Sequence, residues 1–154
     1  MNQLSMETPI GKLTISERDG FITHVYFCGE ESNANDTETP LLLQAKTQLT
    51  EYFNGTRKTF DLPIKPNGGE FFRRVWSKMI ELVPYGQTAS YGELAKLAGN
   101  EKASRAVGMA NNRNPIPIII PCHRIVGKNG KLTGFRGGLD SKQWLLEHEK
   151  NNLN

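Results

Sequence analysis

The chain has 154 residues, 37% of them hydrophobic and 23% charged, which is the composition of one ordinary globular domain or two small ones. The first residues contain neither the basic nor the apolar segment of a secretory signal, and no apolar run is long enough to span a bilayer. We therefore expect a cytoplasmic protein that makes no membrane contact.

The net charge of +3 is the sum of two halves of opposite sign. Residues 1–69 contain 6 Lys and Arg and 9 Asp and Glu, whereas residues 70–154 contain 13 and 7. A basic half suits nucleic-acid binding, but a solvated basic surface has the same composition. Charge alone leaves both interpretations open.

The first half contains an expected hairpin and an expected helix. Residues 11–27 form two apolar-rich segments around Asp19-Gly20, a pair that favours the left-handed backbone of tight hairpin turns. Thr39-Pro40 then opens a helix, because threonine caps helices and proline suits their first position.

A short strand is expected over residues 58–64, and a linker over residues 65–70. Proline, asparagine and glycine occur together in this linker, which makes it the best candidate for a domain boundary. We therefore expect a small α/β domain over residues 1–66 and a second domain over residues 67–154.

The second half begins with three expected helices. The spacing of apolar residues predicts a helix over residues 70–83. Ser90 and Glu93 form a capping box for a second helix, and Gly99 separates it from a third, residues 102–111. Two short helices joined by a glycine-containing turn are typical of a helix-turn-helix.

The third of these helices has two unlike faces. Its small apolar residues recur at helical spacing and are expected to pack inward: Ala103, Ala106, Val107 and Ala110. The opposite face holds Arg105, Gly108 and Asn112, so the backbone could approach a surface closely around one long side chain. The residues alone leave open whether Arg105 is solvated or contacts DNA.

An apolar strand over residues 116–120 and a strand pair around Asn129-Gly130 are expected next. A hairpin that follows a helix-turn-helix gives a winged-helix arrangement. The second half of the chain is therefore expected to be mostly helical, with a short β wing.

The last expected helix, residues 140–150, opens with a capping box of Asp140 and Gln143. Its spacing places Glu149 on the apolar side and Glu147 on the polar side. A carboxylate that faces inward needs a partner, because burial without one costs several kcal/mol.

The sequence "IPCHR" places Cys122 directly before His123, in a chain whose other cysteine is Cys28. Two thiols make a poor disulfide framework, so we expect both to be reduced. A thiol needs a base to become a nucleophile, and the base works best when a third group, here Glu149, orients it. Since neighbours on a strand point to opposite faces, this relay requires a bridging water or a bend after Pro121.

The residues alone do not exclude a different interpretation of this pair. Cysteine is among the most buried residue types, and a buried structural Cys122 beside a hydrogen-bonded His123 would give the same local sequence.

Longer motifs connect the chain to a known family. Residues 114–149 read "NPIPIIIPCHRIVGKNGKLTGFRGGLDSKQWLLEHE", and the segments "VPYGQTASYGELAKLAG" and "SRAVGMANNRNP" precede them. Together these segments resemble the O6-alkylguanine-DNA alkyltransferases, also called methylated-DNA–protein-cysteine methyltransferases, over residues 71–150. The resemblance implies a small ribonuclease H-like α/β domain followed by a mostly helical winged helix-turn-helix domain that carries the reactive cysteine.

The resemblance also implies the activity. The expected protein repairs O6-alkylguanine, and also O4-alkylthymine, by irreversible, stoichiometric transfer of the alkyl group to its own cysteine after the nucleotide is flipped out of the duplex. Its expected partner is double-stranded DNA, bound through the minor groove. It implies a monomer without a cofactor, and leaves open whether several copies cluster along DNA.

Five residues match the family's reactive centre. Cys122 matches the alkyl acceptor, and His123 and Glu149 match the water-mediated relay. Asn114 matches the hinge between the recognition helix and the active site, and Tyr91 matches the donor of a proton to the departing guanine.

Further residues match the DNA-contacting surface and the pocket. Arg105 matches the arginine that fills the gap left by the flipped nucleotide. The other expected DNA contacts are Ser90, Gly108, Asn112 and Arg124, and the expected pocket residues are Phe135, Arg136 and Gly137.

Some members of the family bind zinc in the small domain. Here that domain offers only His24 and Cys28 as soft ligands, which are too few for a closed tetrahedral site, so we expect no metal.

Two other classes of protein share single features with this sequence. A winged-helix regulator would explain the basic half but not the PCHR motif or an inward Glu149, and it would keep its function in a Cys122→Ala variant. A cysteine hydrolase would need an oxyanion hole, for which the sequence has no signature.

Overall fold

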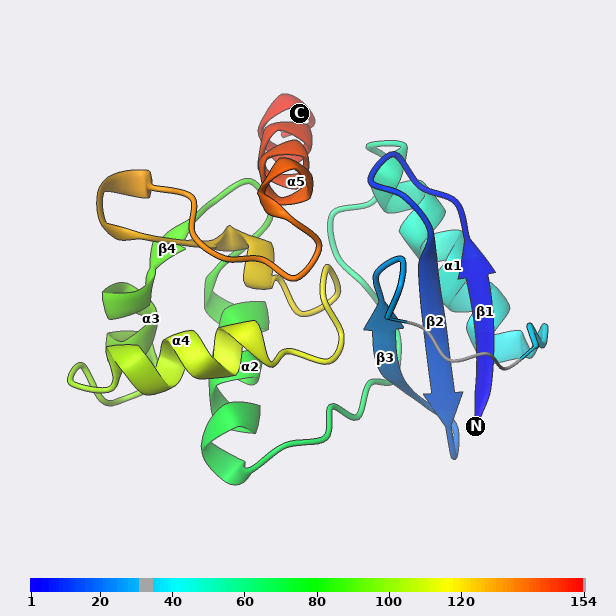
Figure 1. Cartoon of the computed structure of the whole chain (residues 1–154), viewed down its shortest axis with the longest axis horizontal. Helices are drawn as coiled ribbons and strands as arrows, with labels where there is room; N and C mark the ends of the chain where they lie inside the picture. The colour runs from blue at the N-terminus through cyan, green and yellow to red at the C-terminus, as the bar shows by residue number, and fades with distance from the viewer. Residues whose placement is uncertain (31–34, 154) are drawn as a thin grey trace. The chain divides into compact units, whose positions relative to one another are not determined.

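Figure 1 shows the chain as a computed structural model, which describes residues 1–30 and 35–153. The chain divides into two compact units, Met1–Asn67 and Gly68–Asn154. No helix within the described ranges is long and apolar enough to cross a membrane.

The first unit is a three-stranded antiparallel sheet in the order β1-β2-β3, with one helix, α1, packed across it (Figure 1). The strands are β1 (Asn2–Met6), β2 (Leu13–Arg18) and β3 (Phe21–Tyr26). Asp19 and Gly20 adopt φ values of 53° and 83° between β2 and β3, so the predicted hairpin is confirmed.

Helix α1 (Pro40–Phe53) begins as predicted, with the Thr39 hydroxyl accepting a hydrogen bond from the Leu42 amide at 3.1 Å. Its inner face fills the core of the first unit. The fully buried side chains on that face are Leu42, Ala45, Leu49 and Tyr52.

The predicted strand over residues 58–64 is wrong, because only a single bridge, Ile22 to Ile64, forms in this described segment. The reason is local. Pro63 has no N–H for a ladder, and the Gln48 side chain donates to the Asp61 carbonyl at 3.0 Å and accepts from the Asp61 amide at 2.9 Å.

The second unit is mainly helical. Helix α2 (Glu70–Leu82) leads through β4 (Ala89–Ser90) into α3 (Tyr91–Leu97) and α4 (Ser104–Asn112). The predicted capping box of α3 is confirmed: the Ser90 hydroxyl accepts from the Glu93 amide, and the Glu93 carboxylate accepts from the Ser90 amide. Helices α3 and α4 pack together as the predicted helix-turn-helix.

The Trp76 indole fixes α2 against α4, because its Nε1–H donates to the Ala110 carbonyl at 2.8 Å in the core. The inner face of α2 contributes Val75 and Met79 beside Trp76 to the core, whereas Ile80 is exposed.

The segment that was predicted as an apolar strand, residues 116–120, is a tight turn. The Ile120 amide donates to the Ile116 carbonyl at 2.9 Å, and Ile118 adopts a φ of 74°. Pro117 and Pro121 lack the N–H groups that a strand ladder would need, so the apolar run folds back on itself instead.

The predicted wing forms only in part. Asn129 and Gly130 make the expected left-handed turn, with φ values of 63° and 79°. The strand pair is wrong, because β5 (Ile125–Val126) pairs in parallel with β4 and residues 131–135, all of them described, form no strand.

The last helix, α5 (Leu139–Asn151), begins one residue earlier than predicted. Gly138, at a φ of 93°, occupies the cap position, and no side chain caps the helix. Asp140 therefore lies in the first turn and Gln143 bonds to Glu147 at 3.0 Å, so the predicted capping box is wrong.

Candidate active site

The chain bends directly after Pro121. Residues Cys122–Arg124 form a single 3-10 turn, η1, in which all three side chains are buried. The Cys122 amide donates to the Ile120 carbonyl at 2.8 Å, and the Arg124 amide donates to the Pro121 carbonyl at 3.0 Å. The bend that the sequence required for a Cys–His relay is therefore present.

His123 is held by the carboxylate that the sequence placed on the inner face of α5. Its Nε2 lies 2.6 Å from Glu149 Oε2, and the two side chains are 0% and 1% exposed. The other ring nitrogen, Nδ1, is buried and has no hydrogen-bond partner among the residues that the structure describes. Nε2 of the ring is thus paired with Glu149, and Nδ1 can take part in a further proton transfer.

Arg124 does not lie where a DNA contact would place it. The side chain is buried, and its Nε and Nη2 donate to Glu149 at 2.8 and 3.1 Å. Its Nη1 donates to the Val83 carbonyl at 2.9 Å. With its donors engaged inside the unit, Arg124 is a partner of Glu149, and this placement contradicts the predicted DNA contact.

Asn114 connects the end of α4 to the reactive turn. Its Nδ2 donates to the Ile120 carbonyl at 2.8 Å, and its Oδ1 accepts from the Ile116 amide at 2.9 Å. The side chain is 1% exposed. These two bonds close the turn that leads into Cys122.

Tyr91, the first residue of α3, shares a 2.7 Å hydrogen bond between its hydroxyl and that of Thr133. A Cβ added to Gly108 would lie 3.7 Å from the Tyr91 ring, so α4 passes close to this side chain. The structure therefore brings Tyr91 together with Gly108 and the loop that precedes α5.

Lys142 is a buried residue of this site that the sequence reasoning missed. The side chain is 0% exposed, and its Nζ donates to the carbonyls of Ile125 at 2.6 Å and Thr133 at 3.0 Å. Its position could have been predicted from the sequence, since Lys142 lies seven residues before Glu149 and residues seven apart share a helix face.

The ionisable groups of the site influence one another. Burial raises the pKa of the Cys122 thiol, and a hydrogen bond from Asn114 and the charges of Arg136 and Lys142 oppose that rise. Burial would also raise the pKa of Glu149, but its contacts with His123 and Arg124 outweigh burial and hold that pKa well below its usual range.

The predicted DNA-contacting residues on α4 lie on its outer side. Arg105 and Asn112 are exposed, and Gly108 is partly exposed between them. Ser90 is half-buried, and its hydroxyl oxygen is already engaged in capping α3.

The predicted pocket residues lie in the loop before α5. Phe135 and Gly137 are half-buried, whereas Arg136 is exposed and donates from Nη2 to the Asn114 carbonyl at 2.7 Å. Arg136 thereby connects this loop to the backbone of Asn114. Within the described residues, no group of three or more His, Cys, Asp and Glu side chains could hold a metal ion.

Comparison with known proteins identifies the class of both units. Residues 3–66 match the ribonuclease-like domain of 6-O-methylguanine DNA methyltransferases, and residues 70–151 match the DNA-binding domain of the same proteins. The chain belongs to the 6-O-methylguanine DNA methyltransferase family. The expected fold class, an N-terminal α/β domain followed by a helical DNA-binding domain, is confirmed.

Individual relatives agree with this membership. The chain is 45% identical to a methylated-DNA–protein-cysteine methyltransferase of Methanosarcina mazei, over 96% of both chains. It is 44% identical to the constitutive enzyme of Bacillus subtilis, over 94% of this chain and 92% of that one. The crystal structure of Mycobacterium tuberculosis OGT in complex with DNA is similar at a TM-score of 0.90 and 40% identity, covering 99% of this chain and 94% of that one.

Proposed function

We propose that this protein repairs O6-alkylguanine, and O4-alkylthymine, in double-stranded DNA by moving the alkyl group onto Cys122. The observation that carries the proposal is the buried Cys122 in a turn beside the His123–Glu149 pair, in a chain of this family. Asn114 braces that turn from the end of α4, which would couple lesion binding to the reactive sulfur.

The proposed chemistry begins with the thiol. Cys122 gives its proton, through one bridging water, to Nδ1 of His123, and the imidazolium is stabilised by Glu149. The sulfur then attacks the alkyl carbon in line, so that the S–C bond forms while the C–O6 bond breaks. No cofactor takes part, because the thiolate supplies the electron pair and the guanine leaves with the pair from the C–O6 bond.

Tyr91 is the proposed donor of a proton to the departing guanine. A neutral guanine is a far better leaving group than its anion, and proton transfer of this kind typically contributes about 10²–10⁴-fold to the rate. The product on the protein is a thioether, which has no easy leaving group. The protein would therefore act once, as a stoichiometric reagent.

The DNA-facing side of the proposal rests on α4. The target atom lies inside the duplex, so the nucleotide must be flipped out, and Arg105 would fill the gap in the base stack. Gly108 and Asn112 would let α4 approach the minor groove, where binding depends little on sequence. We further propose a cytoplasmic monomer, because both of its cysteines, Cys28 and Cys122, are free thiols, which suits a reducing compartment.

The test is direct. The protein is mixed with a short duplex that carries one O6-methylguanine, then digested, and the cysteine peptides are weighed by mass spectrometry. We expect one methyl group per protein, on Cys122 only, and an unmodified Cys28, although Cys28 is the exposed thiol. A Cys122→Ala variant should bind the duplex and leave the lesion intact.

The opposite result is equally clear. An unmodified Cys122 and an intact lesion, with wild-type protein still bound to the duplex, would refute the transferase and favour a DNA-binding regulator. Methylation of Cys28 as well as Cys122 would indicate chemical alkylation without a specific site.

A further inference from the structure

The Glu149 carboxylate is contacted by nitrogen atoms of Arg124, His123 and Gly86, which come from other segments. Arg124 donates to both of its oxygens, from Nε to Oε1 at 2.8 Å and from Nη2 to Oε2 at 3.1 Å. His123 Nε2 lies 2.6 Å from Oε2, and the Gly86 amide donates to Oε1 at 3.2 Å. Glu149 is 1% exposed, so these contacts take the place of water.

A carboxylate in this position has to be ionised. The guanidinium of Arg124 has only donors and reaches both carboxylate oxygens in a forked arrangement, and its positive charge stabilises the carboxylate over the carboxylic acid. An ionised Glu149 can only accept from His123, so the shared proton belongs on Nε2. In a neutral imidazole, Nδ1 is then the nitrogen with the lone pair, which is the atom that the proposed relay needs.

Arg124 also helps to keep the imidazole neutral before the reaction. Burial favours neutral His123, but the Glu149 carboxylate favours imidazolium, and an imidazolium cannot accept the thiol proton. The guanidinium compensates the negative charge of Glu149 and so weakens the preference for imidazolium. Its position is fixed by the Val83 carbonyl, which accepts from Nη1 at 2.9 Å, and it lies 5.7 Å from the centre of the Tyr85 ring.

Burial and the neighbouring charged groups shift the pKa of His123 in different directions. Burial lowers the pKa of His123; the charge and hydrogen bond of Glu149 raise it; the charges of Arg124 and Lys142 lower it. The Cys122 thiol is neutral at rest, because burial raises its pKa. Burial likewise raises the pKa of Tyr85, which faces Glu149 and Arg124 and stays neutral.

We propose that Arg124 is a positioning residue of the relay: its guanidinium holds Glu149 ionised, so that His123 stays neutral with its proton on Nε2 and keeps Nδ1 as the proton acceptor for Cys122. The expected effect on the rate of methyl transfer rests on the proposed function, whereas the expected tautomer of His123 does not. The donors of Arg124 are engaged by Glu149 and the Val83 carbonyl, so it acts on His123 through Glu149.

The kinetic test distinguishes the effect of the positive charge of Arg124 from the effect of its forked hydrogen bonds. The rate constant of methyl transfer is measured against pH for wild type, Arg124→Met and Arg124→Lys, with the lesion duplex in excess. Arg124→Met removes the positive charge beside Glu149 and His123, so both groups bind their protons more tightly. We therefore expect the acidic limb of the pH–rate profile to shift to higher pH by about one pH unit. In Arg124→Lys the charge remains, so the limb should stay, while the plateau rate falls because the forked contact is lost.

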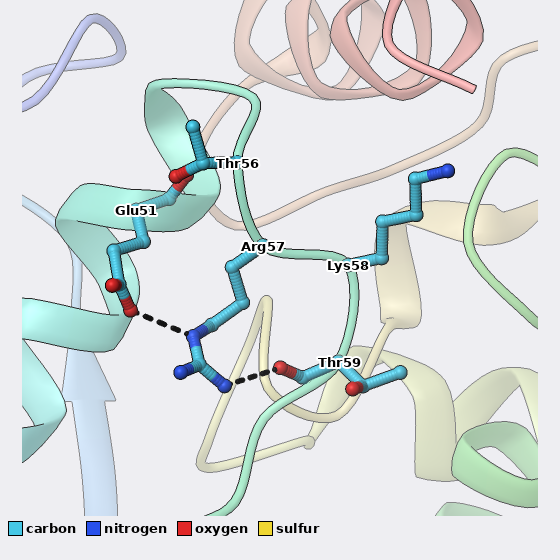
Figure 2. Close-up of a pocket in the computed structure, with 5 residues that line it drawn as sticks. All are labelled: Glu51, Thr56, Arg57, Lys58 and Thr59. Atoms are coloured by element: carbon cyan, nitrogen blue, oxygen red, sulfur yellow. Dashed lines mark hydrogen bonds and ion pairs between the residues drawn. The ribbon is translucent and has the colours of Figure 1, made fainter. Parts of the chain in front are cut away.

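A matched control exists in the first unit. Arg57 donates from Nε to Glu51 Oε1 at 2.9 Å and from Nη1 to the Thr59 carbonyl at 3.0 Å, as Figure 2 shows. Arg57→Met therefore removes an arginine that also bonds to a glutamate through Nε and to a carbonyl oxygen through Nη1, with the same change in net charge. We expect it to leave both the acidic limb and the plateau unchanged.

A measurement on the wild-type protein tests the tautomer without any variant. In the ¹⁵N spectrum of the histidine rings at pH 7, His123 should show a protonated Nε2 and an unprotonated Nδ1. A protonated Nδ1, whether as the other tautomer or as imidazolium, would overturn the proposal even if Arg124→Met failed to fold. A folded, active Arg124→Met with an unshifted acidic limb would overturn it as well.

The two proposals fail in different ways. If wild-type protein leaves Cys122 unmethylated, the proposed function is wrong, and the ¹⁵N spectrum still decides the role of Arg124. If Cys122 is methylated and the acidic limb does not depend on the charge of residue 124, the function stands and the role of Arg124 is wrong.

Discussion

Two arginine–glutamate pairs in this molecule share a short contact between Nε and Oε1 and have very different surroundings. Arg124 Nε lies 2.8 Å from Glu149 Oε1, and Arg57 Nε lies 2.9 Å from Glu51 Oε1. The first pair is 7% and 1% exposed, whereas the second is 29% and 42% exposed. The Nε–Oε1 distance alone would rank the pairs as equals, so burial and the forked contact of Arg124 have to account for any difference in what they do.

Burial gives the inner pair its influence on chemistry. Water screens the Arg57–Glu51 pair, so neither group changes the behaviour of a third residue strongly. Inside the second unit there is little water between Glu149, Arg124 and His123, and each charge acts on the others at close to full strength. The same interaction is therefore a surface contact in one unit and a control on proton affinity in the other.

The largest expected difference between the pairs appears when the acid is neutralised. Glu149→Gln leaves the Arg124 cation buried without its counter-charge, which typically costs about 3–5 kcal/mol of folding free energy. Glu51→Gln exposes Arg57 to water and should cost about 0–1 kcal/mol. Urea unfolding of the two variants measures both values. Equal costs would contradict the view that burial distinguishes the pairs.

A second test uses acid. The folded pKa of Glu149 lies below its ordinary 4.5, and that of His123 lies below its ordinary 6.5, so at low pH the unfolded chain binds more protons than the folded chain. Stability from His123 should begin to fall below about pH 6.5, and that from Glu149 below about pH 4.5, each at up to about 1.4 kcal/mol per pH unit.

Urea unfolding between pH 7 and pH 4 checks this slope. Glu149→Gln should lose the part below pH 4.5, and Glu51→Gln should keep the wild-type slope. A wild-type stability that is flat over this range would mean that neither buried group differs in proton affinity from the unfolded chain.

The sequence predicted well what short-range chemistry determines. The Asp19-Gly20 turn, the Thr39 cap and the Ser90–Glu93 capping box depend on a few neighbouring residues and their backbone preferences, and all three are confirmed. The burial of Glu149 followed from helical spacing alone and is also confirmed. These features needed no knowledge of which segments meet in space.

The failures share a different cause. Arg124 was predicted to contact DNA and Lys142 was not singled out, because only the approach of Glu149, Thr133 and Ile125 makes the burial of these two cations favourable. The strand predicted over residues 116–120 failed for a related reason. A continuous apolar run has no period that separates a strand from a buried turn, and here two prolines decide.

The smallest expected difference is the response of each pair to salt. Raising the ionic strength from 0.1 M to 1 M shortens the Debye length from about 10 Å to about 3 Å, which weakens only charges that reach solvent. Arg57→Met should therefore cost less than about 1 kcal/mol at 0.1 M and close to nothing at 1 M. Arg124→Lys should cost the same at both salt concentrations, because ions do not reach the buried carboxylate. Urea unfolding at the two concentrations measures both costs, and a cost of Arg57→Met that persists in 1 M salt would place the exposed pair in the same class as the buried one.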